Sequence, residues 1–179
     1  EEIIPYLDKL SKTAEKIGAV NCITISKKKK LKGYNTDYHG FKKSIKPLLK
    51  DHHKKALILG TGGASKAIAY ALRSLKIEYD FVSRTADEFQ FKYEELDASI
   101  FEEYTIVINT TPVGTHPNVD DCPNLDYSLF TKKHIAYDLI YNPEETAFLR
   151  KAKAQGAVTK NGYEMLVLQA EKAWKIWNE

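Results

Sequence analysis

The sequence contains little cysteine and no long apolar run. Its two cysteines, Cys22 and Cys122, are too few for the disulfide framework of a small secreted domain and are typical of a reducing compartment. No apolar stretch approaches the roughly 18 residues needed to cross a bilayer. The first residues also lack the basic and apolar regions of a secretory signal. We therefore expect a cytoplasmic protein without a membrane partner.

A large excess of charge of either sign is also missing. The 27 basic and 24 acidic residues leave a net charge of +3 and are mixed along the chain, so no basic patch predicts a nucleic-acid partner. Metal-ligand spacing is missing as well, because no histidine forms a ligand pattern with cysteines or carboxylates. We expect no metal at any of the five histidines, which are His39, His52, His53, His116 and His134.

Apolar residues at helical spacing are present at the start of the chain. They predict an amphipathic helix over about the first 17 residues, ended by Gly18 in the left-handed cap position. Strands are expected over 19–26 and 31–36. The four lysines at 27–30 are interpreted as a solvated turn between these strands, because like charges in a tight turn favour water.

A second helix is expected to run through Leu48, with Thr36 or Asp37 as its cap. Pro47 and the polar stretch 50–55 then indicate a domain boundary. Beyond it, apolar strands alternate with helices, and this alternation predicts an α/β fold with a doubly wound parallel sheet. The expected strands are 56–59, 78–83, 105–109, 135–140 and 157–160, and the expected helices are 64–75, 144–155 and the segment after Gly162.

A glycine turn lies between the first of these strands and its helix. Gly60 permits a tight turn, and Gly62 lets the backbone approach a pyrophosphate, which the positive end of the following helix would attract. Ser65 stands where the dinucleotide-binding fingerprint has its third glycine. The turn therefore favours a nucleotide site but leaves open a plain strand-to-helix turn.

The end of the second strand indicates which dinucleotide is bound. NAD binders usually carry an acidic residue there for the ribose hydroxyls, whereas this chain has Ser83, Arg84 and Thr85. A guanidinium suits a 2′-phosphate. Asp80 lies about 20 residues after the glycines, but the strand continues beyond it. NADP is therefore the favoured cofactor.

Two further segments follow strands at the same edge of the predicted sheet, where ligands of open α/β sheets bind. In 109–114, Thr110 and the rigid Pro112 suit a wall beside the cofactor, although they also suit a tight turn. In 138–143, Tyr141 is expected either near the nicotinamide or over the core.

Six segments together resemble the shikimate dehydrogenase family, in family order and with family spacing. They are 18–21, 33–37, 60–67, 109–114, 138–143 and 161–170. The resemblance implies a Rossmann-like NADP-binding domain at 51–162 and the C-terminal remnant of a truncated α/β substrate domain at 1–50. It also implies a closing helix at 163–179 that returns to the substrate domain.

The activity that the resemblance implies is the reversible NADPH-dependent reduction of 3-dehydroshikimate to shikimate, a step of chorismate and aromatic amino-acid biosynthesis. Asp37 matches the catalytic aspartate, Asn21 and Gln169 match amides that bind the substrate hydroxyls, and Tyr141 is expected to contact substrate and cofactor. The positions that match the cofactor side are Gly60, Gly62, Gly63, Ala64, Ser65, Ser83, Arg84, Thr85, Thr110, Tyr141 and Gly162.

The sequence departs from the family pattern at two places. Asp87 and Glu88 stand where the family often has a second arginine, which weakens the expected recognition of a 2′-phosphate. The family's catalytic lysine lies immediately before a segment like 1–4, and the serines that hold the substrate carboxylate lie further upstream. Without them, we expect the chain to bind NADP but to reduce 3-dehydroshikimate at a negligible rate.

Other interpretations remain open at this point. One is a quinate/shikimate dehydrogenase that uses NAD, and another is a non-catalytic nucleotide-binding module. A folate dehydrogenase would fit the sheet but not the combination of Asn21, Asp37 and Gln169. An unpaired strand edge would also suit association into a homodimer.

Overall fold

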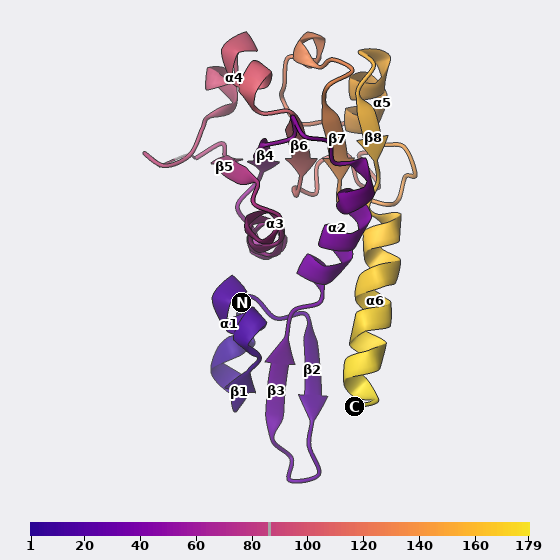
Figure 1. The fold of residues 1–179 in the computed structure, drawn as a ribbon. Helices are drawn as coiled ribbons and strands as arrows, with labels where there is room; N and C mark the ends of the chain where they lie inside the picture. Colours follow the sequence, from indigo (N-terminus) through magenta and orange to yellow (C-terminus); the bar gives the residue numbers. More distant parts are fainter. Residues whose placement is uncertain (86) are drawn as a thin grey trace.

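The computed structural model describes residues 1–85 and 87–179. It contains a three-stranded sheet of order β1-β3-β2 and a five-stranded sheet of order β5-β4-β6-β7-β8. The small sheet lies at one end of the molecule, and helix α6 (Tyr163–Trp177) runs alongside it from the large sheet (Figure 1). No helix in the described ranges has the length and apolar character that would let it cross a membrane.

The first segment is not the single helix predicted for the first 17 residues. A short 3₁₀ turn, Ile4–Tyr6, is followed by strand β1 (Lys9–Leu10), which pairs with β3 (Leu31–Tyr34). Helix α1 begins only at Lys12, because the Ser11 hydroxyl accepts a hydrogen bond from the backbone N–H of Ala14 and caps it there.

The end of α1 and the hairpin after it agree with the sequence. Helix α1 (Lys12–Ile17) ends at Gly18, whose φ of +72° is the left-handed conformation expected of a cap. Strand β2 (Cys22–Ile25) pairs antiparallel with β3, and the lysine turn joins them in solvent.

The large sheet is fully parallel. Its strands are β4 (Lys55–Leu59), β5 (Glu78–Val82), β6 (Ile106–Asn109), β7 (Ile135–Asp138) and β8 (Val158–Lys160). The chain moves from β4 outward to β5 and then returns to the other side of β4 with β6. This reversal creates a switch point between β4 and β6, outside whose carboxyl ends ligands bind in doubly wound folds. The predicted fold class is confirmed.

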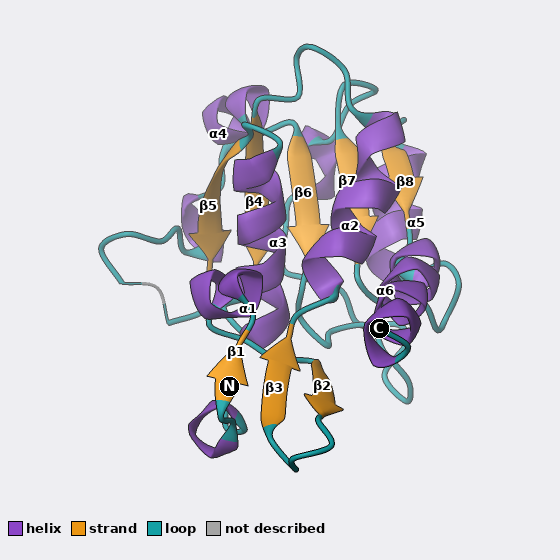
Figure 2. Cartoon of the chain, turned by 60° about the horizontal axis from the view of Figure 1, so that its bottom comes forward, coloured by secondary structure: helices purple, strands orange, loops and turns teal. Residues whose placement is uncertain are grey.

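Helices cover both faces of this sheet (Figure 2). They are α3 (Gly63–Ser74), α4 (Ala98–Glu103) and α5 (Ala147–Ala154), together with α2 (Asp37–Ile45), which leads in from the small sheet. Alternate residues of β4 therefore enter different cores: Ile58 packs with the α2 and α3 side, and Leu57 and Leu59 pack on the other. Burial on both faces explains why the central strands β4, β6 and β7 are mostly apolar, whereas the edge strands β5 and β8 contain charged residues.

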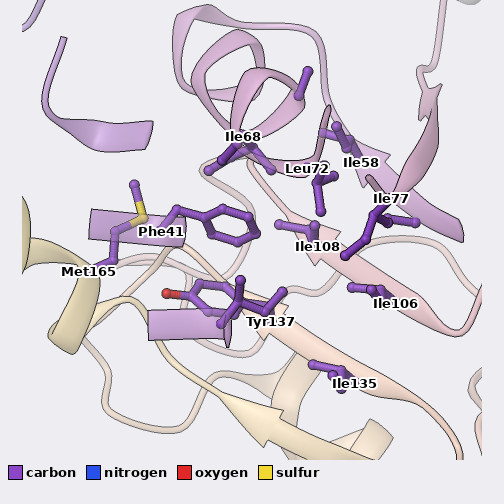
Figure 3. Close-up of a cluster of buried hydrophobic side chains, with 14 residues drawn as sticks. Phe41, Ile58, Ile68, Leu72, Ile77, Ile106, Ile108, Ile135, Tyr137 and Met165 are labelled. Atoms are coloured by element: carbon purple, nitrogen blue, oxygen red, sulfur yellow. The ribbon is translucent and has the colours of Figure 1, made fainter. Parts of the chain in front are cut away.

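Helix α2 is joined to the large sheet by a buried contact. The rings of Phe41 and Tyr137 meet edge to face with centroids 4.9 Å apart (Figure 3). The Tyr137 hydroxyl lies 2.6 Å from Ser44 Oγ. On its other side α2 packs closely on α6, since a Cβ on Gly40 would lie 2.4 Å from the carbonyl oxygen of Met165. A side chain at position 40 would force these helices apart.

Candidate active site

Three polar side chains from distant segments line one pocket. Asn21 precedes β2, Asp37 is the first residue of α2 and Gln169 lies on α6. They surround a cavity of about 360 Å³, and Leu139 and Met165 supply part of its apolar wall. The structure therefore brings together the three residues that the sequence assigned to the substrate.

A network of hydrogen bonds connects these side chains. The Asn21 amide Nδ2 donates to Asp37 Oδ1 at 2.7 Å and to the Thr36 hydroxyl at 3.1 Å. That hydroxyl lies 3.0 Å from Gln169 Oε1 and donates to it. Thr36 was not predicted as a site residue from the sequence. Its position inside the 33–37 motif was the available signal, but its partner Gln169 lies 133 positions away.

Asp37 is half-buried, and its environment changes its acidity. Burial raises the pKa of this carboxyl above its usual value, and the hydrogen bond from Asn21 offsets part of that rise. Thr36 is the N-cap residue of α2, but its side chain makes no capping bond. Thr36 therefore occupies the predicted N-cap position without making a capping bond, and Asp37, the other predicted cap, lies inside the first turn of the helix.

The glycine turn follows β4 at the switch point. Gly60 has a φ of +99°, which side-chain-bearing residues rarely adopt, and a Cβ there would meet Thr111 Cγ2 at 2.9 Å. No atom of the described residues lies within 4 Å of the place where a Cβ on Gly62 would project. Ser65 Oγ donates to the Gly62 carbonyl at 2.6 Å, so this serine closes the turn where the fingerprint has glycine.

The first turn of α3 is suited to an anion. Gly62 is its N-cap and provides no side-chain cap, and this turn contains no acidic residue. Gly63 and Ala64 begin the helix, so their N–H groups face outward from its positive end. A pyrophosphate would supply the missing hydrogen-bond acceptors.

Ser83, Arg84 and Thr85 follow β5 directly. The Ser83 backbone N–H donates to the Phe91 carbonyl, and the Thr85 N–H donates to Ser83 Oγ at 3.3 Å. Arg84 and Thr85 are exposed. As expected from the sequence, Asp80 lies inside β5, where it accepts a hydrogen bond of 2.6 Å from the Tyr104 hydroxyl.

A second cavity, of about 460 Å³, adjoins the first. Thr110 and His116 line it, and it shares Ala64, Leu139 and Tyr141 with the pocket of Asn21, Asp37 and Gln169. The Thr110 hydroxyl donates to the Leu59 carbonyl at 2.7 Å, which ties this wall to the end of β4. Tyr141 is 48% exposed and lines both cavities.

Gly162 has a packing role that the sequence did not show. A Cβ at this position would lie 1.9 Å from the Leu139 carbonyl oxygen, and the Gly162 N–H donates to the Ile140 carbonyl at 3.0 Å. The absence of a side chain lets the start of α6 lie against the end of β7. Gly162 thereby places Gln169 over the pocket.

The buried Asp138 carboxylate holds together the segments that border the site. It is fully buried and accepts hydrogen bonds from Thr146, Asn109 and the Ile140 N–H at 2.6, 3.1 and 3.0 Å. Burial raises its pKa to about 6. These bonds hold the loops after β6 and β7 at the cleft. Within residues 1–85 and 87–179, no cluster of histidine, cysteine and carboxylate side chains suits a metal.

The fold and the site define a class of protein. A doubly wound parallel sheet with a glycine turn at its switch point, beside a pocket of amide and carboxylate groups, is the arrangement of a dinucleotide-dependent oxidoreductase acting on a small polar molecule.

Comparison with known proteins identifies the family, although no family model matches the chain. A shikimate dehydrogenase (NADP⁺) from Caldanaerobacter subterraneus is 41% identical over 99% of this chain and 68% of the relative. The chain belongs to the shikimate dehydrogenase family. It spans about two thirds of the length of this relative.

Solved structures of similar fold agree with this family assignment. The shikimate 5-dehydrogenase of Thermus thermophilus, in complex with NADP(H) and shikimate, superposes with a TM-score of 0.84 at 35% identity, over 99% of this chain and 69% of that one. A quinate dehydrogenase from Corynebacterium glutamicum in complex with NAD gives 0.80 at 28% identity, over 98% and 68% of the two chains. The same fold therefore serves a related substrate and the other dinucleotide in that neighbour.

Proposed function

We propose that the two adjoining cavities hold shikimate and the nicotinamide end of NADP⁺ for the reversible reduction of 3-dehydroshikimate. The observation that carries the proposal is the wall shared by Ala64, Leu139 and Tyr141. A hydride can pass only between ligands in contact, and this wall is where occupants of the two cavities would meet.

The residues present fit the cofactor. The open space in front of Gly62 and the uncapped start of α3 suit the pyrophosphate, and exposed Arg84 at the end of β5 suits the 2′-phosphate. Thr110 and Tyr141 would border the nicotinamide. When bound, NADPH supplies the hydride, and the chain's own residues bind and orient both ligands.

The substrate pocket offers complementary polar groups. Asp37 Oδ1 accepts from Asn21, which leaves Oδ2 to accept a hydrogen bond from a substrate hydroxyl. Gln169 directs Oε1 towards Thr36, so its Nε2 is the atom available to donate to substrate oxygens. A polyhydroxylated acid would otherwise lose hydrogen bonds to water when it entered the pocket.

Asp37 also suits the proton transfer that accompanies hydride transfer. When shikimate is oxidised, its reacting hydroxyl loses a proton, and the carboxylate accepts the hydrogen bond of that hydroxyl. Because burial raises the pKa of Asp37, it accepts a proton more readily than an exposed aspartate would. Asn21 holds the carboxylate in place during the transfer.

Quinate with NAD is the second candidate, because the Corynebacterium quinate dehydrogenase shares the fold and Asp87 and Glu88 are exposed beside Arg84. The two carboxylates would repel a 2′-phosphate. The Arg84 guanidinium, which follows the strand directly, favours NADP.

Calorimetric titration of the chain tests the proposal. We expect NADP⁺ to bind more tightly than NAD⁺, and shikimate more tightly than quinate once NADP⁺ is present. Gln169→Ala should weaken shikimate binding, whereas Gln155→Ala, at an exposed glutamine after α5, should not. Tighter binding of NAD⁺ and quinate would support the second candidate instead. Binding of neither polyol would refute both.

A further inference from the structure

We propose that Thr36 is a positioning residue that fixes which atom of Gln169 faces the substrate. This inference rests on the proposed function, because it assigns Gln169 the role of a hydrogen-bond donor to a polyol. The geometry that carries it is the partly buried contact between the Thr36 hydroxyl and Gln169 Oε1 at 3.0 Å. Thr36 contacts no pocket space itself, since it is fully buried behind the two amides.

The orientation of Asn21 is set by the backbone. The Thr36 N–H, which can only donate, lies 2.8 Å from Asn21 Oδ1. Asn21 Nδ2 therefore points the other way, to Asp37 Oδ1 and to the Thr36 hydroxyl. Asn21 would keep this orientation if the hydroxyl were removed, because its bonds to the Thr36 N–H and to Asp37 would remain.

Among residues 1–85 and 87–179, the Thr36 hydroxyl is the one group that forms a hydrogen bond with the Gln169 side chain. A hydroxyl has one proton to donate and two lone pairs. Asn21 Nδ2 donates to Thr36 Oγ1 at 3.1 Å, so the single hydroxyl proton is left for Gln169 Oε1 at 3.0 Å or Asn21 Oδ1 at 3.3 Å. The contact with Gln169 is the shorter one, and Asn21 Oδ1 already has the backbone N–H, so the proton is directed to Gln169 Oε1. Because Oε1 is held there, Nε2 with its two donors is left for the ligand.

The backbone around Thr36 supports this assignment. Thr36 is the N-cap of α2, a position where a threonine side chain ordinarily accepts from the first turn of the helix, but here it makes no such bond. A buried hydroxyl without a partner would be costly, so its bonds to the two amides are what satisfies it. The Thr36 side chain thus serves the pocket, and Asn35 Oδ1 accepts the Tyr38 N–H of the first turn at 3.3 Å in its place.

The test compares Thr36→Val with Thr36→Ser. Valine keeps the branched shape and removes the hydroxyl, whereas serine keeps the hydroxyl. The side-chain amide signals of Asn21 and Gln169 are followed by NMR, assigned through Asn21→Asp and Gln169→Glu. Thr36→Val should convert the Gln169 signal to that of a freely turning amide. The Asn21 signal should shift, because Nδ2 loses its bond to the hydroxyl, but it should remain that of a held amide, because the bonds to Asp37 and to the backbone N–H of residue 36 persist. Thr36→Ser should leave both as in the wild type.

Binding provides the functional readout. Thr36→Val should weaken shikimate binding by about 5- to 10-fold, the effect of losing one preorganised hydrogen bond, and leave NADP⁺ binding within about twofold. Thr36→Ser should restore shikimate binding. Thr105→Val is the matched control, because Thr105 is a buried threonine before β6 that lines neither cavity of the site. It should change neither amide signal.

Each outcome decides the matter. An unchanged Gln169 signal in Thr36→Val, or a changed signal with unchanged shikimate binding, overturns the proposal. Conversion of both signals to those of freely turning amides would show a general loss of structure and overturn it as well. If the wild type binds no shikimate while Thr36→Val frees only Gln169, the positioning role stands and the proposed function fails. Thr36→Ala removes the same hydroxyl should valine prevent folding.

Discussion

Asn21 Nδ2 lies 2.7 Å from Asp37 Oδ1, and this hydrogen bond connects the residue before β2 to the first turn of α2. This bond is the contact in the pocket that opposes the effect of burial on the Asp37 carboxyl. The amide stabilises the charged form, so the two residues together determine the pH range in which Asp37 is a carboxylate.

Asn21→Ala should therefore raise the pKa of Asp37 further. Shikimate binding that needs the carboxylate is lost as the pH falls through this pKa, so the loss should begin at higher pH in the variant. Shikimate affinity measured from about pH 4 to pH 8 would show the shift. Asn178→Ala, at an exposed asparagine after α6, should keep the wild-type profile. An unshifted profile for Asn21→Ala would mean that another group controls binding.

The glycine turn offers a matched pair of variants. Gly60→Ala should lower the free energy of unfolding by about 1–2 kcal/mol or more, because alanine is strained at a φ of +99° and its Cβ would crowd Thr111. Gly62→Ala should leave stability nearly unchanged, since φ is −75° and the space is open. The new methyl group would instead occupy the place of the pyrophosphate and weaken NADP⁺ binding. Thermal unfolding and NADP⁺ titration separate the two effects. An unaltered NADP⁺ affinity in Gly62→Ala would show that the glycine turn does not contact the cofactor.

Arg84→Ala should weaken NADP⁺ binding by about tenfold and leave NAD⁺ binding unchanged, because only NADP⁺ carries the 2′-phosphate. Arg150→Ala, at another exposed arginine, on α5, is the control and should alter neither. Equal losses of affinity for both dinucleotides would show that Arg84 does not bind the 2′-phosphate.

His134 predicts a pH dependence of stability. Its Nδ1 accepts from the Thr131 N–H at 3.0 Å, and its Nε2 lies 2.9 Å from the Phe101 carbonyl and donates to it. Burial lowers the pKa of this histidine below its usual value. The unfolded chain therefore takes up a proton first, and stability is lost as the pH falls below about 6.5 towards the folded pKa.

His134→Gln should be less stable than the wild type at about pH 8, by about 1–3 kcal/mol, because a buried hydrogen bond is lost. It should also lose less stability than the wild type on acidification to about pH 5, since the titrating group is gone. Denaturant unfolding at both pH values measures the difference. His116→Gln, at an exposed histidine, should retain the wild-type loss, and an equal loss in His134→Gln would assign the effect elsewhere.

Elements with strong local signals could be predicted from the sequence. Gly18 ends α1, and the four lysines form the turn between β2 and β3. Apolar strands alternate with helices around the glycine turn. Each of these features was predictable because its local pattern favours a single structure. The first 11 residues could not be predicted. Their apolar spacing suited a helix, but pairing of β1 with β3 satisfied the backbone instead. Helix α4, with only six residues, was missed because so short a segment has little periodicity.

The site was predictable only in part. The glycine turn and Arg84 follow from their places after β4 and β5, and the resemblance pointed to Asn21, Asp37 and Gln169. Thr36 was missed because its role arises from α6 packing on α2, which no local pattern encodes.

The most direct test of the shared wall is the nuclear Overhauser effect between two ligands bound to the chain together. With NADP⁺ and shikimate both present, a cross-peak is expected between the nicotinamide H4 proton and the proton on C3 of shikimate, and Gln169→Ala should weaken it. Binding of both ligands without that cross-peak would place them in separate sites and contradict the account.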